Sequence, residues 1–325
     1  MSTPLSDPVI AVDGASGYVG NHVVAELRKK NIKVRCIVHP GIKDVDREYL
    51  KSTGAELFQT DLKADSETLL AALSGVDCII HLIGSIAPPK GLKLSDLHAG
   101  QTSELIAACK KAKVPKIVMI TALGTAVDAV SEYHRTKWQS EELIRNSGIS
   151  FVILRPSLII GRVVGSRNSK LIARFNKLIA ERPQVPVIEG AKNLIQPVFV
   201  GDLAEAIVSA ALSPSDNPEL KNKTFEIGGD EVQPMHQLIA ALMKQQNVSK
   251  PLKSLPASIA NMAAFFLEMV SPGVPLLSRD QVKLACTNNV CSDNALQSVF
   301  KIRPTSVETA LQSYSAKSQQ SVSNV

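Results

Sequence analysis

A glycine-rich turn directly after the first apolar run is the feature that most constrains the fold of this chain. Residues 8–12 are apolar in the manner of a buried parallel strand, and Gly14, Gly17 and Gly20 follow at once. Residues 22–30 then carry an apolar stripe at helical spacing. A strand, a glycine turn and a helix N-terminus direct free backbone N–H groups and the positive end of the helix dipole at one point. The pattern predicts a phosphate-binding turn, with a turn that serves only helix–strand packing as the alternative.

The rest of the first half alternates between apolar strands and helices. Near-continuous apolar strands with helical crossovers indicate a parallel sheet that is covered on both faces. Further strands are expected at residues 32–38, 56–58, 76–83, 116–121 and 151–154. Helices are expected at residues 69–73, 94–112 and 131–146. The fold class predicted is α/β, a Rossmann-type doubly wound parallel sheet.

The second half predicts a small C-terminal α/β lobe over the carboxyl edge of the sheet. Short strands are expected at residues 196–200 and 224–227, and helices at 171–180, 203–212, 235–244, 259–269 and from 307. The expected division is a nucleotide-binding domain of residues 1–156 with parts of 190–230, an interleaved lobe of residues 157–312, and a flexible Ser- and Gln-rich tail of residues 313–325. The helix near residues 255–270 is apolar on more than one face. We expect it to be packed in the lobe, with a docking face for a membrane or a large complex as the alternative.

Composition narrows the possible partners. The 325 residues are 45% apolar and 20% charged, and the net charge is +6. The basic residues are spread along the chain without interleaved aromatics, so nucleic acid is not expected as a partner. A mild positive balance suits an anionic ligand or an anionic membrane surface and does not choose between them.

The cysteines and the N-terminus predict a cellular location. Five cysteines occur without a CxxC pair, so neither a disulfide framework nor a zinc site is expected and no metal ligands are assigned. Cys36, Cys78 and Cys109 lie in apolar or helical stretches typical of the core. The first strand starts near residue 8, which leaves no room for a signal or transit peptide, and no run of about 20 apolar residues appears. A cytoplasmic protein is expected, and a peripheral position at a membrane stays open.

Tyr133 and Lys137 place a phenol and an ammonium four residues apart, on one face of an expected helix. A neighbouring cation stabilises phenolate and lowers the pKa of a tyrosine, which then serves as a general acid or base near neutral pH. The ammonium can also donate to the ribose hydroxyls of a cofactor. The same spacing occurs on solvated helix faces, but its place after the fifth strand of a nucleotide-binding sheet favours a functional pair.

Several motifs together resemble those of the short-chain dehydrogenase/reductase superfamily, in its extended and atypical branches. They are Gly14-x-x-Gly17-x-x-Gly20, Asp61-Leu62, residues 81–84, residues 121–124, Tyr133-x-x-x-Lys137, residues 154–157, residues 196–202 and residues 225–229. Residues 276–282 and 288–290 resemble the subgroup that contains the NAD(P)H-binding accessory subunit of respiratory complex I. The resemblance covers nearly the whole chain.

The resemblance implies a site for a nicotinamide dinucleotide. Matched in order along the cofactor, the residues are Gly14, Gly17 and Gly20 at the pyrophosphate with the backbone of Ser16, Tyr18 and Val19, then Asp61 and Leu62 beside the adenine, Ile83 and Gly84 near the ribose, Thr121 at the nicotinamide end, Tyr133 and Lys137 at the reacting centre, and Pro156 and Ser157 against the nicotinamide.

Cofactor choice depends on the end of the second strand. A carboxylate there accepts the ribose 2′-OH of NAD, whereas a basic residue favours the 2′-phosphate of NADP. His39 and Lys43 follow this strand, and no carboxylate occurs before Asp44. The sequence predicts NADP, with NAD left open, and Arg35 is a less direct candidate for the phosphate.

Two departures from the superfamily pattern bear on catalysis. Leu123 stands where a catalytic Ser or Thr is usual, two residues after Thr121, and His98 stands in place of a helper Asn. For His98 a single structural hydrogen bond from a helix histidine is favoured over a catalytic role. A Tyr–Lys pair without its hydroxyl partner polarises a carbonyl less well. Two hypotheses stay open. The first is an oxidoreductase or epimerase-like enzyme of low or specialised turnover, in which Tyr133, Lys137 and Thr121 act on an unknown small molecule. The second is a non-catalytic cofactor-binding factor for assembly or stability of a membrane redox complex, or for quinone metabolism.

Overall fold

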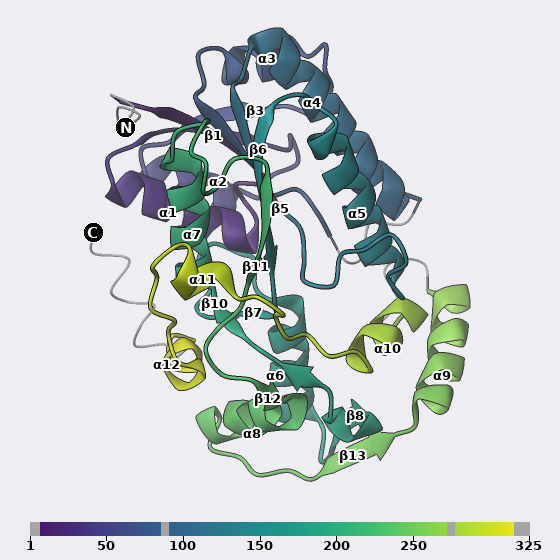
Figure 1. Cartoon of the computed structure of the whole chain (residues 1–325). Coiled ribbons are helices and arrows are strands. Elements are labelled where there is room, and N and C mark those ends of the chain that lie inside the picture. The colour runs from purple at the N-terminus through teal and green to yellow at the C-terminus, as the bar shows by residue number, and fades with distance from the viewer. Residues whose placement is uncertain (1–6, 86–90, 272–276, 315–325) are drawn as a thin grey trace.

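The computed structural model describes residues 7–85, 91–271 and 277–314, and it is built around a parallel sheet of seven strands (Figure 1). The strand order is β11-β6-β5-β4-β1-β2-β3, and each neighbouring pair is parallel. The strands are β1 (Val9–Asp13), β2 (Lys33–Val38), β3 (Glu56–Gln59), β4 (Cys78–His81), β5 (Lys116–Ile120), β6 (Ser150–Pro156) and β11 (Lys223–Ile227). The predicted fold class is confirmed.

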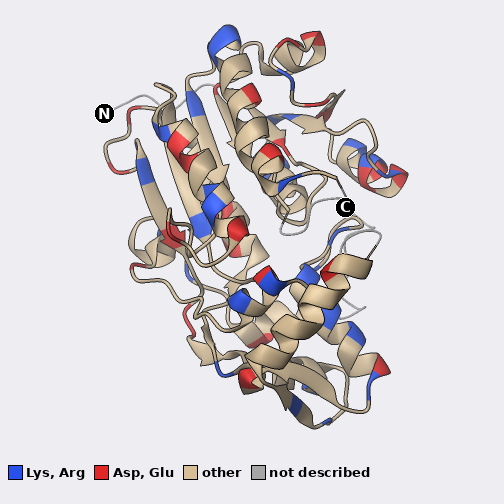
Figure 2. Cartoon of the chain, turned by 90° about the vertical axis from the view of Figure 1, so that its right-hand side faces the viewer, with Lys and Arg blue, Asp and Glu red and all other residues tan. Residues whose placement is uncertain are grey.

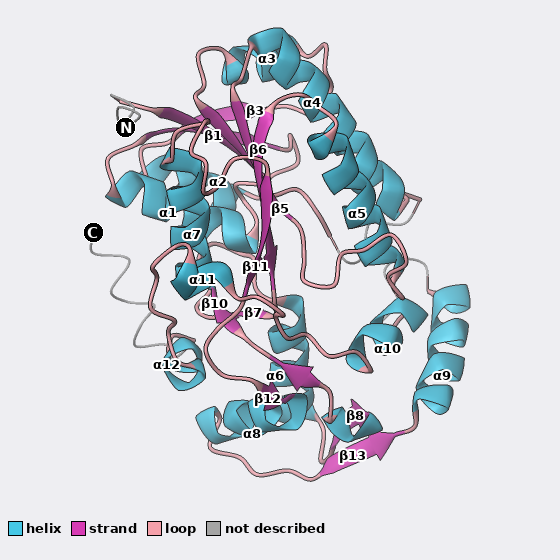
Figure 3. Cartoon of the chain, viewed as in Figure 1, coloured by secondary structure: helices cyan, strands magenta, loops and turns pink. Residues whose placement is uncertain are grey.

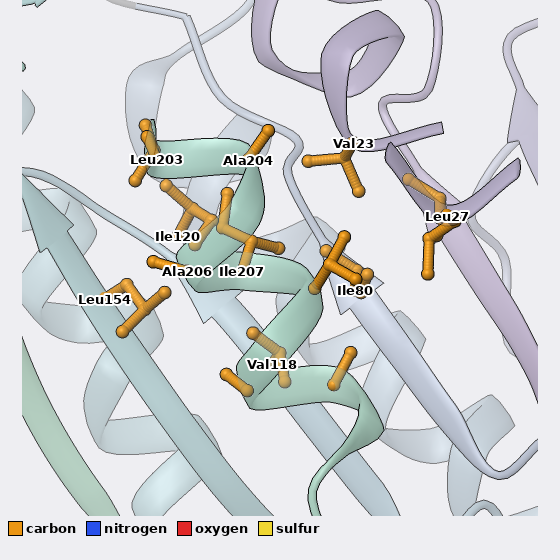
Figure 4. Packing of buried hydrophobic residues seen from close by; sticks show 14 of the residues in the cluster. Val23, Leu27, Ile80, Val118, Ile120, Leu154, Leu203, Ala204, Ala206 and Ile207 are labelled. Carbon is orange, nitrogen blue, oxygen red and sulfur yellow. The ribbon is translucent and has the colours of Figure 1, made fainter. Parts of the chain in front are cut away.

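Helices cover both faces of the sheet, as Figure 3 shows. On one face lie α1 (Tyr18–Lys29), α2 (Asp44–Ser52), α7 (Val200–Leu212) and α11 (Ala295–Ser298). On the other face lie α3 (Glu67–Leu73), α4 (Gln101–Ala112) and α5 (Glu132–Arg145). Each face has its own apolar core, because the strand side chains alternate between the two sides. Figure 4 shows Ile207 of α7 among Ile80, Ile120 and Leu154 of the sheet.

The lobe contains three two-stranded sheets and five helices among the described residues. The strand pairs are β7 (Ile159–Ile160) with β10 (Val198–Phe199), β9 (Leu194–Ile195) with β12 (Gln233–Pro234), and β8 (Val185–Ile188) with β13 (Leu252–Leu255). The helices are α6 (Lys170–Glu181), α8 (Met235–Gln245), α9 (Ala257–Val270), α10 (Arg279–Ala285) and α12 (Val307–Gln312), with a 3-10 turn, η2 (Glu189–Ala191). A third core joins α6, β8, α8 and α12.

Two predicted elements differ from the structure. The helix expected over residues 94–112 opens with a π-helical turn, η1 (Asp96–Gly100), which buries His98. The strand expected over residues 196–200 contains only Val198 and Phe199, and α7 begins at Val200. Asp202 therefore lies in the first turn of α7, where a carboxylate interacts favourably with the positive end of the helix dipole. Its carboxylate accepts from the backbone N–H of Thr305 at 2.6 Å.

The expectation that the helix near residues 255–270 is packed in the lobe holds for one of its faces only. In α9 only Ala260 and Ala264 are buried, against α10 and its surroundings. The bulky side chains point outward: Phe266 is 58% exposed, and Ile259, Met262, Phe265, Met269 and Val270 are also exposed. The small alanine face makes the contact, which leaves the large apolar face open. Figure 2 turns α9 toward the viewer, and Glu268 is the one charged residue within this helix.

Three further expectations can be followed in the structure. Cys36, Cys78 and Cys109 are buried, as predicted. Tyr314, at the start of the expected flexible tail, packs against the lobe core, and its hydroxyl accepts from the N–H of Gly161 at 2.9 Å. Residues 315–325 lie outside the described residues. In the described part of the chain, no helix has the length and apolar character needed to cross a bilayer.

Candidate functional site

The turn after β1 has the backbone shape of a phosphate cradle. Gly14 has a φ of +61°, and its carbonyl accepts from the N–H of Gly17 at 2.8 Å. A Cβ on Gly20 would lie 2.3 Å from the Gly14 carbonyl oxygen, so only glycine fits. Gly17 is the N-cap of α1 and has no side chain to satisfy the first N–H groups. A pyrophosphate therefore fits this turn, which presents backbone donors and the positive end of α1.

The side chains that follow the turn face the lobe. The hydroxyl of Tyr18 donates to the carbonyl of Gly161 at 2.8 Å, and the amide of Asn21 donates to the carbonyl of Val164 at 2.9 Å. The ring of His22 lies 3.1 Å from the carbonyl of Arg162, and burial lowers the pKa of His22 to about 4. Only the backbone of Tyr18 is thus left to face a phosphate, together with that of the half-buried Ser16 and Val19.

Asp13, at the end of β1, fixes the loop that follows β4. One carboxylate oxygen accepts from the N–H groups of Leu82 and Ile83 at 2.8 and 3.1 Å. The other lies 2.6 Å from Nδ1 of His81. This loop lies beside the glycine turn, since a Cβ on Gly14 would lie 3.2 Å from the carbonyl carbon of Leu82. Asp13 thus holds together the crevice at the point where the strand order reverses, which is where open α/β sheets bind ligands.

Gly84 makes room for the ammonium of Lys137. Lys137 Nζ donates to the carbonyl of Ile83 at 3.0 Å, and a Cβ on Gly84 would lie 2.4 Å from Nζ. Burial lowers the pKa of Lys137 to about 8, partly opposed by the charges of Asp13 and Glu141. The structure brings Ile83, Gly84 and Lys137 together beside the glycine turn.

Tyr133 lies one helical turn before Lys137 on α5. Its ring packs edge-on against the rings of His98 and His134, at centroid distances of 5.5 and 5.2 Å. Burial raises the pKa of Tyr133 to about 12. In the cofactor-free protein the pKa of Tyr133 is therefore raised and not lowered as expected, because burial disfavours the charged phenolate.

His98 has the structural role that was expected, but it belongs to a buried polar network larger than the single hydrogen bond predicted. Nδ1 of His98 lies 2.8 Å from the hydroxyl of Thr136, and the N–H of Ser85 donates to Nε2 at 3.4 Å. The hydroxyl of Thr102 donates to the His98 carbonyl and lies 2.9 Å from Nε2 of His81. Burial lowers the pKa of His98 to about 3, so the ring is neutral. The one sequence feature that could have indicated this network is the motif that begins at His81, because His81 is linked to His98 through Thr102.

The Thr121 hydroxyl forms a hydrogen bond with a buried cluster of charged side chains. It donates to the Glu141 carboxylate at 2.7 Å. Glu141 is fully buried and also pairs with Arg145 and Arg155, each at 2.6 Å. Thr121 and Arg155 therefore both face this carboxylate, and the structure does not bring the Thr121 hydroxyl to Tyr133.

The adenine end of the predicted site is open and mixed in charge. His39 is exposed, and its Nε2 lies 3.4 Å from the Asp61 carboxylate. Lys43 is the exposed N-cap of α2, and Leu62 is buried beneath this end. Arg35 is directed elsewhere, since its guanidinium donates to carbonyls at the end of α3, among them that of Ser74 at 2.6 Å.

Arg47 is a basic residue in this region that the motifs did not indicate. It lies in α2, and its guanidinium pairs with Asp44 at 2.6 Å. No sequence motif marked it, because it falls one helical turn beyond the expected phosphate loop.

A cavity of about 580 Å³ lies between the sheet edge and the lobe, and Tyr133 is one of its lining residues. Leu123, Pro156 and Ser157 also line it, while Thr121 does not belong to its lining. The Ser157 hydroxyl donates to the carbonyl of Gln196 at 2.5 Å. The cavity continues into the lobe between α6, β8 and α10.

Comparisons with known protein families divide the chain into two overlapping parts. Residues 14–168 match the family described as NAD(P)H-binding. Residues 104–312, more than half of the chain, match the family described as RmlD substrate binding domain. The chain therefore belongs to the RmlD substrate binding domain family, and its residues 14–168 form an NAD(P)H-binding domain.

Among curated proteins, the chain is similar to a subunit of a respiratory enzyme. It is 27% identical over 304 residues to "NADH dehydrogenase [ubiquinone] 1 alpha subcomplex subunit 9, mitochondrial" of Arabidopsis thaliana, over 90% of this chain and 73% of that protein. It is 28% identical over 229 residues to the protein of the same name from Dictyostelium discoideum, over 69% of this chain and 60% of that protein. The alignment thus spans less than two thirds of the Dictyostelium protein.

Among solved structures, the chain shares the fold of a quinone oxidoreductase and of a nucleotide-sugar epimerase. The NADPH-dependent quinone oxidoreductase of Escherichia coli, complexed with NADPH, matches with a TM-score of 0.70 and 20% identity, over 93% of this chain and 98% of that one. A UDP-glucose 4-epimerase of Thermotoga maritima matches with a TM-score of 0.73 and 16% identity, over 97% and 99%. At these identities the likeness establishes the fold alone.

Proposed function

We propose that this protein is an NADP-dependent oxidoreductase that reduces a carbonyl group, with Tyr133 as the proton donor. One observation carries the proposal. Tyr133 lines the cavity, and on the same helix it lies one turn before Lys137, which is beside the glycine turn and the loop after β4. Tyr133 is therefore a titratable group at the junction between the nucleotide crevice and the space for a substrate.

The chemistry follows from the protonation states. When bound, a reduced nicotinamide supplies a hydride to the carbonyl carbon. The carbonyl oxygen then takes the proton of the Tyr133 hydroxyl, which the raised pKa keeps in place at neutral pH. Lys137, with a pKa of about 8, is mainly charged at neutral pH and stabilises the phenolate that remains. Leu123 supplies no hydroxyl to polarise the carbonyl, so we expect slow turnover.

The preference for NADP rests on the charges after β2. His39 and Lys43 are exposed there, and they favour the 2′-phosphate. Asp61 opposes them, because its carboxylate lies beside His39. We propose that NADPH binds more tightly than NADH and that His39→Ala with Lys43→Ala narrows the difference. Calorimetric titration of both nucleotides measures it, and a clear preference for NADH in the unaltered protein would overturn this assignment.

Activity is tested by following NADPH oxidation with a panel of carbonyl compounds and quinones. Tyr133→Phe removes the proton and keeps the ring, so we expect turnover to fall by about 100-fold or more while NADPH affinity is retained. Tyr49→Phe on α2 is the matched control, since Tyr49 lies outside the cavity lining. NADPH binding without oxidation of any compound in the panel would contradict the enzymatic proposal.

A second candidate function is a cofactor-binding assembly factor for a membrane redox complex. It is favoured by the exposed apolar face of α9 and by Leu123 in place of a hydroxyl. The similarity to NADH dehydrogenase subunits supports such a partner. The test replaces Met262 and Phe266 with Gln and measures co-purification with the subunits of that complex. Loss of association with unchanged NADPH binding would support this function, and unchanged association would contradict it.

A further inference from the structure

We infer that the cavity beside Tyr133 binds a ligand with a long hydrocarbon chain, of isoprenoid or acyl type, and that its wall excludes nucleotide sugars. The inference rests on the proposed function, because it defines the substrate class of that site. It stands on the apolar character of the lining, on the hydrogen bonds that its polar groups already make, and on the two cations of α6 that also line the cavity.

The wall of the cavity is made mainly of apolar side chains from separate elements. α6 contributes three of them, β8 contributes one, and α8 and α10 contribute one each. These residues are Leu171, Phe175, Leu178, Val187, Met235 and Leu284. A space of about 580 Å³ is within the usual range for a small-molecule site. An apolar chain gains free energy against such a wall in proportion to the apolar area removed from water.

Three of the polar lining side chains already make hydrogen bonds within the protein, and these bonds compete with any hydrogen bond to a ligand. Ser157 donates to the carbonyl of Gln196. The side-chain oxygens of Asn288 and Asn289 accept from the backbone N–H groups of Leu194 and Leu158, at 2.8 and 2.7 Å. A sugar brings several hydroxyls, and each one buried without a partner costs about 1–3 kcal/mol. The lining therefore disfavours a sugar and tolerates a chain.

Two cations of α6 lie at the edge of this apolar wall. Lys170 donates to the hydroxyl of Ser85 at 3.0 Å, and Arg174 donates to the Gln281 side chain at 3.3 Å. They join α6 to the sheet domain on one side and to α10 on the other. A diphosphate would pair with these cations, but the nucleoside and sugar attached to it would still meet the apolar wall. A nucleotide sugar is therefore the decisive counter-probe.

The test is equilibrium dialysis of the full chain with farnesol, 1-dodecanol and UDP-glucose, each with and without NADPH. We expect one or both chain alcohols to bind, and the two arms distinguish an isoprenoid from an acyl-type chain. UDP-glucose is expected to bind at least about 10-fold more weakly, which corresponds to about 1.4 kcal/mol. Binding of UDP-glucose as tight as that of the better alcohol, or binding of neither alcohol, would overturn the inference.

Two variants locate the bound chain. Ala285→Trp on α10 fills the cavity, and Val187→Thr puts a hydroxyl into the wall at nearly constant volume. Each should weaken alcohol binding by about 10-fold or more, and Val187→Thr serves if the larger change prevents folding. Ala263→Trp is the control, because Ala263 is exposed on α9. Unchanged binding in both cavity variants would refute the location.

The readouts keep this inference separate from the proposed function. Alcohol binding is measured without turnover, so it can succeed in a protein that never oxidises NADPH. Conversely, NADPH oxidation with a nucleotide sugar, and no chain binding, would leave the enzymatic proposal standing and refute this one.

Discussion

The sheet domain and the lobe differ in the kind of side chains that they bring together. Behind the glycine turn, polar side chains converge: Asp13, His81, Thr102 and His98 form one connected network in which the groups satisfy one another. In the lobe, apolar side chains line a cavity and, on α9, face outward. The comparison teaches that the first region is shaped for a ligand of fixed charge and geometry, whereas the second offers area without a polar pattern.

The difference explains why motifs mark one region and not the other. A phosphate turn needs particular residues, since a Cβ at Gly20 would collide with backbone. An apolar wall needs only side chains of suitable size, and many combinations provide it. A sequence motif can therefore mark the phosphate turn, whereas no motif marks the apolar wall.

The largest effect that would sharpen the comparison is expected from two matched isoleucines. Ile207 in α7 is fully buried against the sheet, while Ile259 in α9 is 50% exposed. Ile207→Ala should lower the free energy of unfolding by about 2–5 kcal/mol, because it leaves a cavity. Ile259→Ala should change it by less than about 1 kcal/mol. Denaturant titration measures both, and a similar cost at the two positions would show that α9 is covered in solution.

The next effect concerns two glycines. Gly20→Ala places a methyl group against the Gly14 and Ala15 backbone, so the turn must shift, at a cost of about 1–3 kcal/mol. Because the shifted turn no longer presents its backbone N–H groups in place, we also expect NADPH to bind about 5- to 150-fold more weakly, which corresponds to about 1–3 kcal/mol of binding free energy. Gly100→Ala is the control, since its Cβ would meet nothing closer than 3.8 Å and the backbone is helical. Calorimetry that found equal NADPH affinity in Gly20→Ala would remove the turn from the cofactor site.

Much of the sheet domain could be predicted from the sequence. The apolar strands and the glycine turn are local patterns, and their burial and order follow from the general rules of parallel sheets. The shared surroundings of Lys137, Ile83 and Gly84 followed from the motifs as well. The packing of α9 could not be predicted, because its alanine face and its bulky face are both apolar, and hydrophobicity alone does not tell which face turns inward.

The hydrogen-bond partners of buried side chains were the other feature that the sequence did not predict. Thr121 carries a suitable hydroxyl at a suitable place in the chain, yet Glu141, twenty residues away, accepts its hydrogen bond. The π-helical turn that buries His98 likewise depends on tertiary contacts with Thr136 and Ser85. Such hydrogen bonds join segments that are far apart in the sequence. A single sequence does not reveal which of these segments meet in the folded chain.

The smallest effect expected is a change in the acid sensitivity of the sheet domain. Burial holds the pKa of His98 at about 3, against an ordinary value of 6.5. Between these values the unfolded chain binds a proton that the folded chain does not, so the free energy of unfolding falls as the pH falls below 6.5. From pH 7 to 5.5 the loss through His98 is about 1 kcal/mol.

His98→Asn keeps a donor for Thr136 and removes the titration, so the slope between pH 7 and 5.5 should become shallower. It should not vanish, because burial also lowers the pKa of His22, to about 4. His39→Asn is the matched control, since it makes the same replacement at an exposed histidine outside the polar network of His98. Denaturant titrations at several pH values measure the slope. An identical slope in His98→Asn and the unaltered protein would mean that water reaches His98 in solution, and the polar network behind the glycine turn would then resemble the open lobe more than a closed core.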